Sequence, residues 1–321
     1  MNQLQLFLPC AAGVEGFLAD EVHQITGLTG NDLLVGRGGV LLRASWRDAL
    51  LLNLHSRLAQ RVLVQLAQGL YRSENDIYAL ASGIAWEIWF TPRQSFKVEV
   101  TAQHSPLTSL NFAALRTKDA VADRFRAKAG VRPDVDTQWP DVRVHLHLTT
   151  DEATVYIDTS GEPLFKRGWR NVKEGGAKGD APLKETLAAA MIAATGWDPQ
   201  GEAPLPLYDP CCGSGTVLIE AAQMACRIAP GLQRHFAFEK LLPFQAHVWS
   251  AIKEEANSAI TTCATGIFGS DISHRMVDFA ERNAERAGVA QAVQLRGGDA
   301  LQRMPPCEQP GVMLLNPPYG E

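Results

Sequence analysis

The stretch LYDPCCGSGTVLIEAA, Leu207–Ala222, decides the fold of the second half of this chain. An apolar run that ends in Asp209 predicts a strand, the Cys-Gly-Ser-Gly sequence predicts a tight turn, and the apolar residues that follow predict a helix. Small residues in such a turn let a ligand approach the free backbone N–H groups at the helix N-terminus. The spacing is not GxGxxG, so the dinucleotide-binding fingerprint is not met.

Two acidic residues continue this pattern further along the chain. The segments IFGSDIS (267–273) and RGGDA (296–300) place Asp271 and Asp299 directly after apolar strand candidates. In an open parallel sheet, ligands lie at the carboxyl ends of the strands, where a carboxylate can accept both hydroxyls of a ribose. We therefore expect a nucleoside-shaped site, with Asp271 at the ribose and Asp299 at an adenine amino group.

The final strand candidate leads into LLNPPYGE (314–321). Pro317 and Pro318 restrict the backbone and bias Asn316 toward an extended conformation, which directs its side-chain oxygen and the Pro317 carbonyl at one spot. These acceptors would draw the hydrogens of an exocyclic base amine toward tetrahedral geometry and stabilise the charge that develops as the amine attacks. Tyr319 would stack on an extruded base. We assign catalysis to Asn316, Pro317, Pro318 and Tyr319.

Length and composition bound the remaining possibilities. The 321 residues suggest about two domains with room for a small third one, and 46% hydrophobic with 20% charged residues excludes disorder, collagen and coiled coil. A net charge of −5 means that a nucleic-acid partner must be held by a local basic patch.

Metal binding and membrane association are not indicated. The six cysteines show no CxxC pair, and His145 and His147, at spacing two, have no further ligand nearby in the sequence. Unpaired thiols fit a reducing compartment, and the uncharged runs are too short to span a bilayer. We therefore expect a cytoplasmic protein without a metal or a membrane partner.

The organisation changes at KRGWRNVKEGGAKGDAP (166–182), which predicts a basic, glycine-rich linker. Before it, short elements of mixed type predict an α+β half, and after it, alternating strands and helices predict a parallel α/β sheet. The strands that we expect are 40–43, 62–66, a region around 96–100 and a hairpin of 142–148 with 154–158, followed by 205–208, 266–269, 292–295 and 312–315. The expected helices follow residues 13, 48, 112, 183, 215, 245 and 273.

The motifs DPCCGSGT and NPPYGE together resemble the amino-methylating branch of the S-adenosylmethionine-dependent methyltransferases, and APLKETLAAAMI (181–192) is similar to the segment ahead of their first strand. The insert 227–255 with its APGL sequence, and DTSGEPLFKRGWR (158–170), resemble the bacterial large-subunit ribosomal RNA guanine-N2 methyltransferases of the RlmL type. This resemblance covers essentially the whole chain. It implies methyl transfer to the N2 amine of a guanine in 23S ribosomal RNA.

The resemblance also implies a domain order. It predicts a ferredoxin-like domain over 1–48, a THUMP RNA-binding domain over 49–165, the linker over 166–182, and a Rossmann-like methyltransferase domain over 183–321. A complete sheet of this kind has further strands after the NPPY motif, so we expect this domain to be truncated at its C-terminus. The implied cofactor is S-adenosylmethionine, and the residues expected to bind it are Asp209, Cys212, Gly213, Ser214, Gly215, Thr216, Asp271, Asp299, Pro182, Lys184, Glu185 and Thr186.

RNA contacts are expected from two local basic clusters. One lies between residues 112 and 132 and the other between residues 166 and 178, and in both of them basic residues far outnumber acidic ones. The second cluster also contains Trp169, which is available for stacking on a base. The residues that we assign to RNA binding are Arg116, Lys118, Arg124, Lys166, Arg167, Trp169 and Arg170.

Several alternatives stay open. The NPPY motif serves any exocyclic amine, so adenine-N6 methylation of RNA or DNA is the nearest rival, and a non-catalytic RNA-binding protein that keeps the pocket is a different class. A nicotinamide oxidoreductase is disfavoured by the missing GxGxxG. The adjacent Cys211 and Cys212 would suit the thiol nucleophile of cytosine-C5 methylation, but they lie in the turn and not beside the base.

Overall fold

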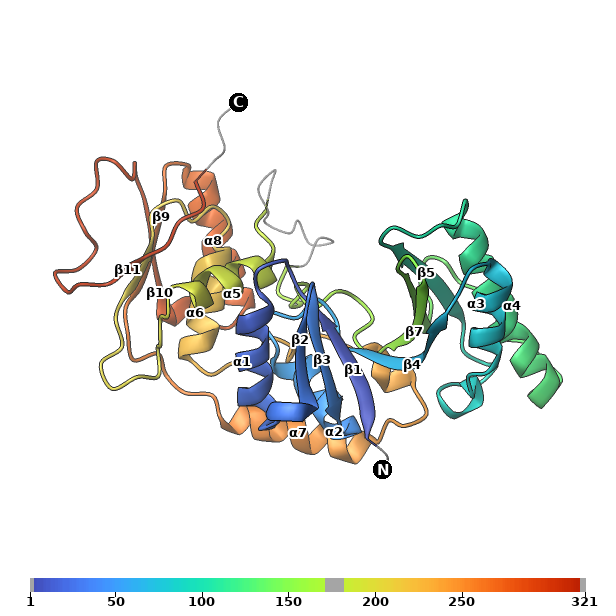
Figure 1. Cartoon of the computed structure of the whole chain (residues 1–321). Coiled ribbons are helices and arrows are strands. Elements are labelled where there is room, and N and C mark those ends of the chain that lie inside the picture. The colour runs from blue at the N-terminus through green and yellow to red at the C-terminus, as the bar shows by residue number, and fades with distance from the viewer. Residues whose placement is uncertain (1–2, 171–181, 318–321) are drawn as a thin grey trace.

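A computed structural model describes residues 3–170 and 182–317 of the chain, and Figure 1 shows the path of its elements. The first unit contains β1 (Leu4–Pro9), α1 (Glu15–Thr26), β2 (Leu33–Gly36), β3 (Gly39–Ala44), α2 (Trp46–His55) and β4 (Leu63–Leu70). Its strands are antiparallel in the order β2-β3-β1-β4. This is the arrangement of a ferredoxin-like βαββαβ unit, as expected.

The division that the sequence suggested after residue 48 falls inside α2. This helix begins with a capping box, in which Ser45 and Asp48 exchange hydrogen bonds between side chain and backbone. The fourth strand of the unit, β4, then pairs with β1 at its start and with β7 along its length. We therefore propose that the first two units share β4 and that a boundary on packing grounds lies within that strand.

The second unit continues the same sheet. It contains α3 (Glu74–Ser82), β5 (Phe96–Ala102), α4 (Leu110–Ala129), β6 (Val142–Leu148) and β7 (Glu152–Asp158). The sheet order runs on from β4 as β4-β7-β6-β5, and only the β5–β6 pairing of these is parallel. The expected hairpin of β6 and β7 is confirmed. Helices α3 and α4 lie together on the outer side of this part of the sheet (Figure 1).

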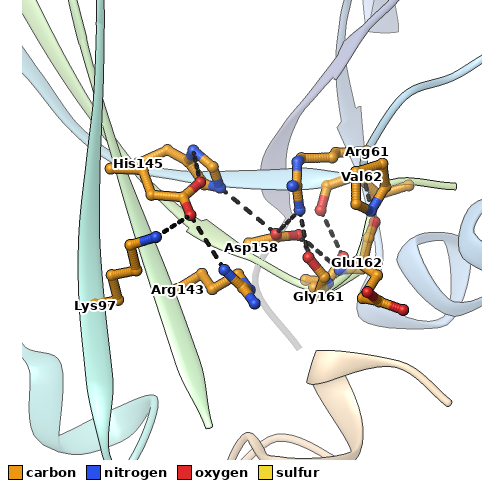
Figure 2. Close-up of polar contacts among 12 residues, drawn as sticks. Arg61, Val62, Lys97, Arg143, His145, Asp158, Gly161 and Glu162 are labelled. Atoms are coloured by element: carbon orange, nitrogen blue, oxygen red, sulfur yellow. Dashed lines mark hydrogen bonds and ion pairs between the residues drawn. The ribbon is translucent and has the colours of Figure 1, made fainter. Parts of the chain in front are cut away.

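The opposite face of this sheet is polar, because β6 alternates between buried aliphatic residues and the partly exposed Arg143, His145 and His147. Figure 2 shows Asp158, at the end of β7, between Arg61 and His145. Its carboxylate accepts a hydrogen bond from Arg61 Nη1 at 2.5 Å and from the Ser160 backbone N–H at 2.8 Å. It also lies 3.5 Å from His145 Nε2. These contacts fix the turn through which the chain leaves the second unit.

The third unit is α/β. It contains α5 (Glu185–Ala194), β8 (Leu207–Asp209), α6 (Thr216–Ala225), α7 (Ala246–Ser258), β9 (Ile267–Asp271), α8 (His274–Arg286), β10 (Val293–Gly297) and β11 (Val312–Met313). Its strands are parallel in the order β10-β9-β8-β11. The expected parallel sheet is confirmed, and the strand order reverses at β8, which pairs with β9 on one side and β11 on the other.

The insert, residues 227–255, connects the third unit to the first two. Phe236, Phe238 and Trp249 are buried in the hydrophobic core of the N-terminal half. The rings of Phe236 and Phe238 stack with centroids 5.1 Å apart, and Trp249 meets Phe238 edge-on at 5.0 Å. The insert therefore lies within the third unit in sequence, between α6 and β9, but packs with the first two units.

One arginine of the insert holds the chain that leaves β7. The guanidinium of Arg234 donates hydrogen bonds to four backbone carbonyls in the segment 160–166, at distances from 2.7 to 3.2 Å. Its side chain also lies over the ring of Phe236, 4.8 Å from the centroid. The exit from the second unit is thus fixed to the insert.

In the ranges 3–170 and 182–317, no helix is both long and apolar enough to cross a membrane.

Candidate active site

The turn after β8 is locked to its neighbours in the sheet. The Cys212 N–H donates to the Ser270 carbonyl of β9 at 2.9 Å, and the Gly215 N–H closes the turn onto the Cys212 carbonyl at 2.8 Å. Gly215 has a φ of +86°, and a Cβ atom there would lie 3.0 Å from the Cβ of Ala280 in α8. Only glycine fits this position without strain. The turn therefore presents the N-terminus of α6 at the carboxyl edge of the sheet.

Three carboxylates converge at this edge. Asp209 Oδ1 accepts from the Cys211 N–H at 3.0 Å, and Asp271 Oδ2 accepts from the Gly213 N–H at 2.9 Å. The Gly298 N–H donates to the Asp271 carbonyl at 2.9 Å, which brings the segment with Asp299 alongside. Burial and then the charges of all three aspartates raise the pKa of the Cys211 thiol. The structure thus brings together the three strand-end acids that the sequence singled out.

Asp209 is the buried member of this group, with 2% of its surface exposed. Burial raises its pKa to about 7, the nearby charge of Asp271 adds to this, and the hydrogen bond from Cys211 opposes it. A buried carboxylate in this state would be stabilised by a cation brought close to it. This set of acceptors therefore fits the cofactor S-adenosylmethionine, which carries an ammonium group at one end and ribose hydroxyls and an adenine amine at the other.

The two cysteines of the turn do not have the character of nucleophiles. Burial and then the charge of Asp209 raise the pKa of both the Cys211 and the Cys212 thiol. A thiolate is the reactive form of cysteine, and these surroundings disfavour it. This argues against a covalent cytosine-C5 mechanism.

Asn316 lies just beyond β11, on the other side of β8 from Asp271 and Asp299. Val312 pairs with Leu207, and the Leu314 N–H donates to the Tyr208 carbonyl at 2.9 Å, so the chain reaches Asn316 past the end of β8. The reversal of strand order between β8 and β11 is the switch point at which ligands of open α/β sheets bind. Asn316 is partly buried and Pro317 exposed, whereas Pro318 and Tyr319 lie outside the described residues.

The segment ahead of β8 contributes one buried residue to this region. Glu185, at the start of α5, is buried, and burial raises the pKa of its carboxyl although Arg170 lowers it. Thr186 is partly buried, while Pro182 and Lys184 are exposed. The ammonium of Lys184 lies 5.4 Å from the centre of the Phe165 ring. Of these four cofactor candidates, Glu185 is the one joined to the turn, through Arg170.

The linker residues are placed differently from what the sequence suggested. Lys166 is exposed, but Arg167 and Trp169 are only 3% and 2% exposed. Arg167 Nε lies 2.9 Å from Glu220 Oε1, and Trp169 belongs to the core of the third unit. The expectation that these two contact RNA is corrected here, because neither presents a surface on which a phosphate or base could lie.

The basic residues of α4 are partly engaged within the second unit. Arg124 forms a two-pronged ion pair with Glu87, at 2.6 and 3.1 Å. Arg116 donates to Asn75 at 3.0 Å and lies over the ring of Tyr78. Lys118, 3.5 Å from Asp119, is half-exposed. Their assignment to RNA remains a prediction.

Two buried polar residues near the turn escaped the sequence analysis. Asn283 of α8 donates from Nδ2 to the Ser214 carbonyl at 2.9 Å and so ties the turn to the next helix. Glu220 of α6 is fully buried and pairs with Arg57 at 3.1 Å as well as with Arg167. The available signal was the same for both, a polar residue at an otherwise apolar helical position.

Comparisons with known families divide the chain as the fold does. Residues 5–63 match the RlmL ferredoxin-like domain, residues 71–158 match the THUMP domain, and residues 167–321 match the RMKL-like methyltransferase domain. Among curated proteins, the chain is 38% identical to the "Ribosomal RNA large subunit methyltransferase K/L" of Psychromonas ingrahamii, over 99% of this chain and 42% of that protein. The protein of the same name from Shewanella pealeana is also 38% identical, over 99% and 44%. The chain spans less than half the length of these relatives.

Two solved structures share the fold of this chain over its whole length. The chain is similar to "SMU.472, a putative methyltransferase complexed with SAH", with a TM-score of 0.87 and 30% identity over 100% of this chain and 82% of that one. It is equally similar to "a predicted N6-adenine-specific DNA methylase from Listeria monocytogenes", with a TM-score of 0.88 and 30% identity over 100% and 81%.

Proposed function

This chain belongs to the family of THUMP-containing, RMKL-like methyltransferases, and from that premise we propose that it transfers a methyl group from S-adenosylmethionine to the N2 amine of a guanine in large-subunit ribosomal RNA. The observation that supports the proposal is that Asp209 and Asp271 end, and Asn316 follows, three neighbouring parallel strands, so that all three lie at the carboxyl edge of the sheet around one switch point. The names of the curated relatives support the ribosomal RNA substrate, and the THUMP domain supports RNA as the polymer. A ribosomal substrate fits a cytoplasmic location.

Each residue of the candidate site has its own role in the proposed reaction. Asp209 and the turn would hold the amino-acid end of the cofactor, Asp271 would hold the ribose, and Asp299 would hold the adenine. When bound, the cofactor supplies a methyl group on a sulfonium, which is electrophilic without further activation. The Asn316 side-chain oxygen and the Pro317 carbonyl would accept the hydrogens of the target amine and so orient its lone pair for attack. Transfer would form the N–C bond as the sulfonium S–C bond breaks and releases S-adenosylhomocysteine, and the proton that the methylated amine loses would pass to solvent. Because this is catalysis by alignment, no strong general base is needed.

The test is transfer of labelled methyl from S-adenosylmethionine to undermodified large-subunit ribosomal RNA by the full-length protein, followed by digestion to nucleosides. We expect N2-methylguanosine. Recovery of N6-methyladenosine would keep the fold and cofactor but overturn the choice of base. Binding of S-adenosylhomocysteine without any transfer to RNA or DNA would favour a non-catalytic RNA-binding protein.

Substitution of the amine acceptor separates chemistry from cofactor binding. We expect Asn316→Ala to reduce transfer on the order of 100-fold, because one preorganised group at the reacting centre is lost. Its affinity for S-adenosylhomocysteine should stay within about twofold, since the acids and the turn are untouched. A parallel loss of both would contradict the role of Asn316.

A further inference from the structure

Arg170 reaches from the linker to the cofactor turn. Its Nη2 donates to Thr216 Oγ1 and, at 3.3 Å, to Ser214 Oγ, so one nitrogen contacts both hydroxyls of the turn. Its Nε lies 3.3 Å from Glu185 Oε1 at the start of α5. One guanidinium therefore joins the linker, the turn and the helix ahead of β8.

The aromatic residue beside it fixes the position of this guanidinium. The ring of Trp169 is buried in the core of the third unit, and the guanidinium carbon of Arg170 lies 4.8 Å from its centre. The Arg170 side chain is only 17% exposed. A planar cation held over an aromatic face keeps its donors in a constant direction, which a flexible ammonium would not do.

The positive charge of Arg170 faces carboxylates inside the protein. Burial lowers the pKa of its guanidinium, while the charges of Glu185 and Glu220 raise it. Exposed Lys166, four residues earlier, pairs at 2.6 Å with the exposed carboxylate of Glu162. The two basic residues of one short segment thus have different surroundings, one directed at the turn and one at solvent.

We propose that Arg170 is a positioning residue for the amino-acid end of the cofactor. It acts through Ser214, Thr216 and Glu185, by keeping the turn and the N-terminus of α6 in the shape that accepts the ligand. Arg170 then belongs to the cofactor site and not to an RNA-binding surface. This inference rests on the proposed function, because it takes the ligand of the turn to be S-adenosylmethionine.

The test compares Arg170→Ala and Arg170→Lys with the matched control Lys166→Ala. Affinity for S-adenosylhomocysteine is measured by calorimetry and the melting temperature by scanning. We expect Arg170→Ala to weaken binding about tenfold, the equivalent of one or two lost hydrogen bonds. Arg170→Lys keeps the charge facing Glu185 and should recover the melting temperature but not the affinity. Lys166→Ala should bind within about twofold of the unmodified protein.

Other outcomes overturn the proposal. Unchanged affinity in Arg170→Ala, or full recovery of both readouts by Arg170→Lys, would leave Arg170 with no more than a charge-balancing role. If Arg170→Ala flattened the salt dependence of RNA binding without changing cofactor affinity, Arg170 would belong to an RNA-binding surface after all. Failure of the unmodified protein itself to bind S-adenosylhomocysteine would instead remove the proposed function.

Discussion

Asp209 is buried beside a second carboxylate, and its pKa of about 7 places its titration in an accessible range. A ligand ammonium would favour the ionised form, so protonation of Asp209 and ligand binding should compete. We expect the affinity for S-adenosylhomocysteine to fall as the pH drops below about 7, by up to about tenfold per unit. Calorimetric titrations between pH 5.5 and 8 measure this.

The matched variant for this prediction is Asp209→Asn, which keeps the shape of the side chain and removes the titration. It should bind more weakly at pH 8 and show a nearly flat pH profile. A profile as steep as that of the unmodified protein would assign the pH dependence to another group.

At the scale of elements, the insert is tied to the N-terminal half by Arg234. We expect Arg234→Ala to lower the free energy of unfolding by at least about 2 kcal/mol, because four backbone carbonyls lose a charged donor. His235→Ala is the control, since His235 is next in the sequence and its own side chain is 99% exposed. Denaturant titrations measure both, and an equal effect in the two variants would show that the hydrogen bonds of Arg234 contribute little.

The elements that the sequence predicted well have their own internal signal. The alternation of β6 and the apolar stripe of α8, with Val277, Ala280 and Ala284, depend only on nearby residues. The strand β1 escaped prediction because its role as a central strand comes from β3 and β4, which are distant in sequence. Helix α3 also escaped, since it buries little more than Ile77 and Ala81.

The same distinction applies to the site. The acids Asp209, Asp271 and Asp299 could be found because each follows its own strand. The direction of Arg167 could not, because its partner Glu220 comes from a different unit. Local composition shows how many charges a segment carries, but whether each is paired depends on residues far along the chain.

At the scale of the whole molecule, buried contacts join the third unit to the first two. Glu220 of the third unit pairs with Arg57 of the first, and the aromatic residues of the insert are buried in the N-terminal half. Units joined by a buried, largely hydrophobic interface do not behave as independent domains, so they should lose their structure together. We therefore expect a single calorimetric unfolding transition. Two well-separated transitions, one for each half, would contradict this.

The position of the insert also sets an order of events during synthesis. Trp249 and Ile252 complete the core of the N-terminal half, yet they leave the ribosome only after the linker and much of the third unit have been made. At about 5–20 residues per second, this delay lasts on the order of ten seconds. During that time the nascent N-terminal half lacks part of its apolar contacts, so it is the stage at which this chain should depend most on a molecular chaperone.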